Sequence, residues 1–79
     1  MAITYAWSSP TNDPERPVRG FVIGTGSTTS DLPTQLVAKA VVDVTNPAGV
    51  VTLYGNTGSI ALDRATGTSY RLESDGAWH

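Results

Sequence analysis

The chain of 79 residues contains no cysteine and only one histidine. Without cysteine no disulfide can close a loop and thiolate metal sites are excluded, and one histidine cannot build a histidine-rich metal site. No apolar run approaches the roughly 20 residues that cross a bilayer, and no basic start followed by an apolar stretch indicates a signal peptide. We therefore expect no metal, no cofactor and no membrane partner.

Positive charge is also scarce. The formal net charge is −2, the pI is near 4.9, and the five cations are scattered along the chain: Arg16, Arg19, Lys39, Arg64 and Arg71. A nucleic-acid-binding protein is expected to gather its cations into a basic patch that meets the phosphates. The sequence therefore predicts no nucleic-acid partner.

Large apolar side chains are few, because much of the 39% apolar share is alanine and valine. Below roughly 70 to 80 residues a single core rarely supplies more than about 3 to 5 kcal/mol without a disulfide, a metal or a partner. With the first two excluded, oligomerisation or docking on a larger surface remains. We expect the chain to bury part of its apolar surface against neighbours.

Catalytic constellations are absent as well. The lone histidine, His79, stands at the end of the sequence, where we expect a mobile side chain that serves poorly as a general base. The glycine-rich run at residues 24–30 has no lysine and does not match a phosphate-binding loop, so it predicts a polar loop. The carboxylates fall at predicted turns or on polar strand faces, at Asp31, Asp43, Asp63, Glu73 and Asp75. We interpret the chain as a non-enzyme.

The amino-terminal segment has an aromatic stripe, because Ile3, Tyr5 and Trp7 alternate on one side of a predicted strand. This strand either joins the small core or forms an arm that docks into a neighbouring subunit. Residues 8–17 carry three prolines and predict a loop, with Asp13, Glu15 and Arg16 at a solvated tip. We divide the chain into an amino-terminal strand or arm with its loop, residues 1–17, and an antiparallel β domain, residues 18–79.

Three further segments of residues 18–54 predict structure. Residues 18–24 read as a strand with Phe21 and Ile23 on one face and Val18 and Val22 on the other. A short helical turn is predicted near residues 31–36, with Ser30 or Asp31 as its cap. Residues 36–45 favour a strand over a two-turn helix, and residues 50–54 return antiparallel to it after a turn at 46–49. The strand at 36–45 has one continuous predicted face: Leu36, Ala38, Ala40, Val42 and Val44.

The last twenty or so residues, from position 58 to position 78, predict a hairpin followed by a second turn. Ile60 and Leu62 share a face before a turn at Gly67, and the alternation resumes at Tyr70 and Leu72 with Arg71 and Glu73 on the wetter side. Asp75 and Gly76 then turn the chain so that Trp78 crosses the apolar face of the hairpin. The fold class is thus all-β, a small antiparallel meander or sandwich. Its expected core or interface anchors are Ile3, Tyr5, Trp7, Phe21, Tyr54, Tyr70 and Trp78.

The pattern of Asp63, Thr66, Gly67, Tyr70, Asp75, Gly76 and Trp78 resembles a short β-meander unit of structural proteins of tailed phages, of the head-fibre, capsid-decoration and tail-fibre types. Such units continue into a further strand after the tryptophan, so we expect the last strand to be short or completed by another chain. The resemblance implies a virion protein, made in the host cytoplasm and placed on the capsid surface. It also implies the major capsid protein or other virion proteins as partners, and we expect a homo-oligomer with a trimer favoured.

Two alternatives remain open at this point. A carbohydrate- or surface-binding β module would stack exposed Trp7, Tyr54, Tyr70 or Trp78 on sugar rings. A tail or connector component of the virion would have the same sequence features as a capsid protein.

Overall fold

The structure is a computed structural model that describes residues 3–9 and 16–79. Within these residues the chain forms six strands and one short 3-10 turn. The elements are β1 (Ile3–Ser9), β2 (Val18–Ile23), η1 (Thr29–Asp31), β3 (Lys39–Val42), β4 (Val50–Leu53), β5 (Ile60–Asp63) and β6 (Thr68–Arg71). The all-β prediction is confirmed.

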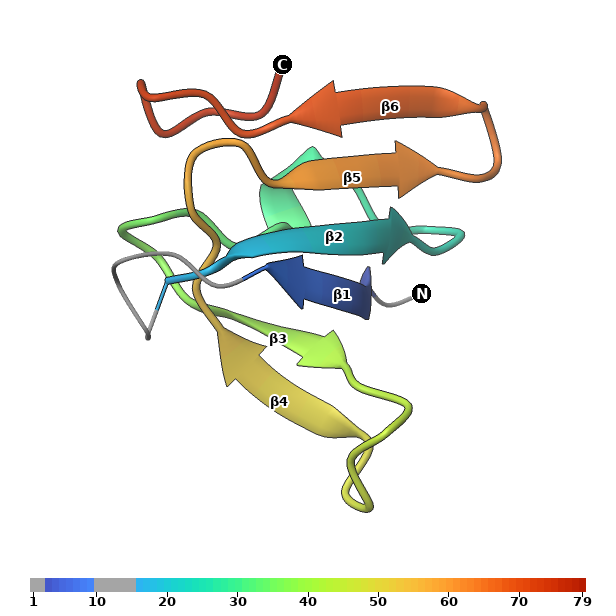
Figure 1. The fold of residues 1–79 in the computed structure, drawn as a ribbon. Coiled ribbons are helices and arrows are strands. Elements are labelled where there is room, and N and C mark those ends of the chain that lie inside the picture. The colour runs from blue at the N-terminus through green and yellow to red at the C-terminus, as the bar shows by residue number, and fades with distance from the viewer. Residues whose placement is uncertain (1–2, 10–15) are drawn as a thin grey trace.

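The strands form one sheet in the order β4-β3-β1-β2-β5-β6, and η1 lies behind it (Figure 1). Hairpins β3–β4 and β5–β6 flank a central hairpin, β1–β2. β3 meets β1 through the pair Thr4 and Val42, and β5 runs parallel to β2. The prediction of consecutive antiparallel strands is therefore wrong in its order, because the central hairpin separates the other two.

The two predicted carboxy-terminal hairpins are present, and both turn where a glycine takes a positive φ. Gly49 has φ 76° and donates its N–H to the Asn46 carbonyl at 2.8 Å, and Gly67 has φ 74° and donates to the Asp63 carbonyl at 2.7 Å. Since a side chain is strained at such angles, glycine is the residue that permits these tight connections.

The predicted strand over residues 36–45 is wrong at both ends, because β3 covers only Lys39–Val42 and Leu36 is 81% exposed. Before β3, the Thr34 hydroxyl accepts hydrogen bonds from the N–H groups of Leu36 and Val37. After it, the Asp43 carboxylate accepts from the backbone N–H and the hydroxyl of Thr45. These local bonds compete with strand pairing and end the strand.

The predicted helical turn exists but lies earlier, at Thr29–Asp31 with Thr28 before it. The Asp31 carboxylate reaches back to the Thr28 backbone N–H at 2.9 Å, so it closes the turn instead of starting one. Leu32 and Pro33 follow and are buried, which brings this loop down onto the sheet.

The core lies on the face of the sheet where η1 and the carboxy-terminal residues pack. Its fully buried side chains come from four strands and the loop after η1: Ile3, Phe21, Ile23, Leu32, Val41 and Ala61. Trp78 covers this core edge-on to Phe21, with ring centroids 6.1 Å apart, and its indole N–H donates to the Pro33 carbonyl at 3.0 Å. Trp78 therefore turns back onto the core beside β2, and not onto the face of Ile60 and Leu62 that the sequence predicted for it.

The amino-terminal segment is a strand within the sheet, which is the first of the two alternatives stated for it. Its alternation breaks at one point, because Tyr5 pairs with Phe21 whereas Trp7 pairs with Gly20. This β-bulge inserts Ala6 and turns Trp7 to the face opposite Ile3 and Tyr5. The prediction that Ile3, Tyr5 and Trp7 share a face is therefore wrong for Trp7.

The loop predicted for residues 8–17 is shorter, since Ser8 and Ser9 belong to β1 and residues 10–15, with Asp13 and Glu15, lie outside the described residues. Arg16 is not a solvated loop tip. Its Nε donates to the Gln35 carbonyl at 2.8 Å, and its guanidinium carbon lies 4.4 Å from the centroid of the Tyr54 ring. Arg16 thus contacts both the segment before β3 and the residue after β4.

Candidate functional site

The face of the sheet opposite the core, here called the open face, carries a continuous row of side chains across all six strands. Strand register defines the row, because residues paired across neighbouring strands point to the same side. From β4 to β6 the row consists of Val50, Val42, Thr4, Val22, Leu62 and Ser69. Beside the row lie Trp7 over Gly20, Ile60 and Arg71, and on β3 and β4 the pair Ala40 and Thr52.

Large apolar side chains of the open face are solvent-exposed. Trp7 is 45% exposed, Val50 56%, Ile60 40% and Leu62 41%, while Val22 and Val42 are half-buried. Contiguous exposed apolar surface on a small protein marks a site of interaction with another macromolecule or a ligand. The open face is therefore the candidate functional site.

Trp7 lies at the centre of this face because of Gly20. A Cβ on Gly20 would overlap the indole atoms Nε1, Cε2 and Cδ1 of Trp7, so the ring rests directly on the glycine backbone. Gly20 is buried although it lies on the exposed side of the sheet. The bulge in β1 and the missing side chain in β2 together set the position of the tryptophan.

Charge on the open face is confined to its margin. Among the strand residues that the structure describes there, Arg71 is the charged one, and it lies on the outer strand β6. The central strands contribute apolar side chains and the hydroxyls of Thr4 and Ser9. The centre of the face can therefore bury apolar surface without desolvating a charge, which would be costly.

The predicted anchor residues are divided between the two faces. Ile3 and Phe21 are in the core, and Tyr5, Tyr70 and Trp78 pack against it. Tyr54 is half-buried beneath Arg16. Of the seven anchors, Trp7 alone is a member of the open face.

The other large members of the open face were missed as a site, because Ile60 and Leu62 were predicted on the same side as Tyr70. The register places Ala61 opposite Tyr70 and between it and Phe21. The two aromatic rings fill this part of the core, so the small residue faces inward and its large neighbours face outward.

A shallow cleft of about 390 Å³ lies on the core side, between η1, the start of β3 and the carboxy-terminal turn. Its lining residues are Thr29, Ser30, Leu32, Thr34, Val37, Lys39, Gly76, Ala77 and Trp78. This lining contains no carboxylate and no histidine, and Lys39 is its one charged side chain.

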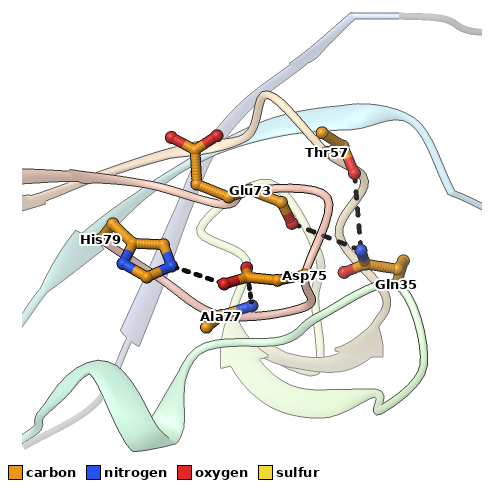
Figure 2. A network of polar contacts seen from close by, with 6 residues as sticks. All are labelled: Gln35, Thr57, Glu73, Asp75, Ala77 and His79. Atoms are coloured by element: carbon orange, nitrogen blue, oxygen red, sulfur yellow. Dashed lines mark hydrogen bonds and ion pairs between the residues drawn. The ribbon is translucent and has the colours of Figure 1, made fainter.

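The carboxy-terminal residues that cover the core are held by polar contacts, which Figure 2 shows. The Gln35 amide reaches the Thr57 hydroxyl and the Glu73 carbonyl, each at 3.5 Å. His79 Nε2 lies 2.8 Å from Asp75 Oδ2, and both side chains are more than half exposed. The His79 ring, and next the backbone N–H of Ala77, lower the pKa of Asp75.

His79 is thus not the mobile residue that its place in the sequence suggests. Its backbone N–H and carbonyl pair with Arg71 at 2.9 Å in both directions, which extends the sheet past β6. Neither His79 nor Asp75 lines the cleft. Their contact lies outside the cleft and is open to solvent.

Neither a metal-binding cluster nor a membrane-spanning helix is found in residues 3–9 and 16–79. This part of the chain brings together no group of three or more histidine or carboxylate side chains able to hold a metal ion. It also forms no helix long and apolar enough to cross a membrane.

No family of known proteins, no curated protein and no solved structure matches the chain. The resemblance to phage structural proteins therefore stays a prediction that depends on the residues between positions 58 and 78.

Proposed function

We propose that the chain is a non-catalytic structural accessory that docks on a phage capsid as a decoration or head-fibre-like protein. The observation that supports this proposal most directly is the one-sided burial of the sheet. The core side is closed by η1 and Trp78, whereas Trp7, Ile60 and Leu62 remain exposed on the other side. A protein that works in an assembly can leave such a face for its neighbours to cover.

Four of the residues on which the phage resemblance depends shape the turns of this fold. Gly67 and Gly76 take positive φ at the two turns, and the Asp63 and Asp75 side chains accept backbone hydrogen bonds there. These residues shape the β5–β6 hairpin and the covering turn. The opposite face of the same hairpin is therefore left for contacts with other proteins of the assembly, further copies of the chain included.

The partners in this proposal are the major capsid protein or other virion proteins, together with further copies of the chain in a homo-oligomer, with a trimer favoured. The location is the capsid surface, after synthesis in the host cytoplasm. A tail or connector position would use the same open face, and binding to isolated capsids or tails distinguishes the two locations.

Co-sedimentation with phage particles assembled without the chain tests the proposal. The wild-type protein should sediment with the particles, and Ile60→Lys, which places a charge on the open face, should remain in the supernatant. Ala65→Lys in the exposed β5–β6 turn is the matched control and should bind like the wild type. Failure of the wild type to bind, or equal binding by Ile60→Lys, would refute docking through this face.

The exposed indole of Trp7 also favours a second function, binding to carbohydrate. Its ring rests on Gly20 at the centre of the open face, so its outer side is free to stack on a sugar ring. Titration of a Trp78→Phe variant with a glycan panel, followed by tryptophan fluorescence, tests this function. Saturable quenching of the Trp7 emission would support it, and an unchanged spectrum would count against it.

A further inference from the structure

The open face carries small side chains on one side of its centre and large side chains on the other. These two parts are called the light half and the bulky half. The light half lies on β3 and β4 and presents Ala40, Val42, Val50 and Thr52. The bulky half lies on β2 and β5, where Ile60 and Leu62 stand beside the Trp7 indole that rests on Gly20. Apolar faces pack well when large side chains of one surface meet small ones of the other.

We infer that the open face is an interface between copies of this chain, in which the bulky half of one copy packs on the light half of another. This inference deepens the proposed function and rests on it in treating the face as an assembly surface. It names a second copy of the chain as the occupant.

Symmetry makes this pairing self-consistent. A two-fold axis that runs along the strands, at the centre between β1 and β2, brings β5 of one copy over β3 of the other. Leu62 then faces Val42, and Ser69 faces Val50, because all four belong to the same row. In a ring of three copies, the bulky half of each copy likewise packs on the light half of the next copy.

The size of the face indicates a partner as broad as the chain itself. The molecule measures 32 × 31 × 18 Å, and the sheet occupies its wide dimensions. A stable interface buries about 800 Å² on each partner, which requires most of such a face. A single helix, about 10 Å across, covers roughly a third of its width, whereas a second sheet packs against all of it at a separation of about 10 Å.

The position of Arg71 agrees with this arrangement. Under the two-fold axis the two β6 strands lie on opposite edges of the pair, five strand spacings apart. At about 4.8 Å per spacing this separates the two guanidinium groups by roughly 24 Å across the sheet, well beyond the screening length of about 8 Å at physiological ionic strength. Like charges are thus kept apart, and the apolar row meets apolar surface.

Cysteine crosslinking of the purified chain tests the pairing, because the chain has no cysteine of its own. Val50→Cys and Ser69→Cys chains carrying different tags are mixed and treated with a short bismaleimide. We expect the mixed product in several-fold excess over either homodimer. A second mixture, Val42→Cys with Leu62→Cys, should behave in the same way.

Ala48→Cys and Ala65→Cys, both in exposed turns, are the matched controls and should crosslink weakly. Light scattering of the wild type should give the mass of a dimer or trimer, and Ile60→Lys should give a monomer that still unfolds cooperatively. A wild-type monomer with no excess of the mixed product would overturn the inference, as would efficient crosslinking of Val50→Cys to itself. Because only the purified chain is used, these results are independent of whether it sediments with capsids.

Discussion

Ser59 makes a buried polar contact between two strands of the sheet. It is fully buried, and its hydroxyl oxygen accepts hydrogen bonds from the backbone N–H groups of Arg19 at 3.0 Å and Asn56 at 3.2 Å. The first of these bonds joins the start of β2 to the residue before β5. Ser59→Ala removes the acceptor and leaves the buried Arg19 N–H without a partner.

The expected loss follows from the cost of an unsatisfied buried donor, which is about 1 to 3 kcal/mol. A single core of this size supplies about 3 to 5 kcal/mol, so the variant loses a large share of the total stability. In urea, with a slope near 1 kcal/mol per molar, the unfolding midpoint should fall by about 1 to 3 M. Tryptophan fluorescence at a fixed protein concentration follows the transition.

Ser74→Ala, in the exposed carboxy-terminal turn, is the control for this experiment. An exposed substitution of this kind should change the free energy of unfolding by less than about 0.5 kcal/mol. If Ser59→Ala shifts the midpoint no more than Ser74→Ala, the hydroxyl does not satisfy these donors and the reasoning about the β2–β5 junction is refuted.

Three other predictions follow from single contacts. Gly20→Ala should destabilise the chain by about 1 to 3 kcal/mol because its methyl group displaces the Trp7 ring; in a Trp7→Ala background the urea midpoint should shift much less, and equal shifts would contradict the contact. Trp78→Phe should cost about 1 kcal/mol in the same assay by removing the indole donor to a backbone carbonyl, and an unchanged midpoint would show that the bond is dispensable. His79→Ala should raise the pKa of Asp75 toward its ordinary value of 3.8 in an NMR titration, and an unchanged pKa in the variant would refute the contact. Because the folded state lowers this pKa, the contact with His79 stabilises the fold at pH values above 3.8. That stabilisation is lost as the pH falls through the lowered pKa of Asp75.

Turn chemistry made the hairpins predictable from the sequence. Asn46 and Gly49, and Asp63 and Gly67, are residue pairs whose backbone and side-chain preferences hold without help from the rest of the fold. The strand over Val18–Ile23 was predictable for a similar local reason, because it is a short apolar run that begins after Pro17 and ends before Gly24. Such features depend on residues that are near one another in the chain.

The order of the strands could not be predicted in this way. β3, β4, β5 and β6 have four residues each, and strands so short carry little information about which non-local partner they choose. Their places depend on side-chain size across neighbouring strands. Ala61 is the clearest case, because it faces inward only since Phe21 and Tyr70 lie on either side of it.

The composition of the open face supports the proposal that a partner buries it. In a sheet with one solvated face, that face normally carries polar side chains in alternation with the buried apolar ones. The strands β2 and β5 break this rule, since their outward residues are Val18, Gly20 and Val22 on one and Ile60 and Leu62 on the other. The bulge in β1 turns Trp7 onto the same face and adds apolar surface to it. A lysine or threonine at this position would have made the face more polar. Large apolar side chains are thus scarce in the core partly because several of them lie on the open face. Under the proposal, a partner of similar breadth shields these exposed side chains from water.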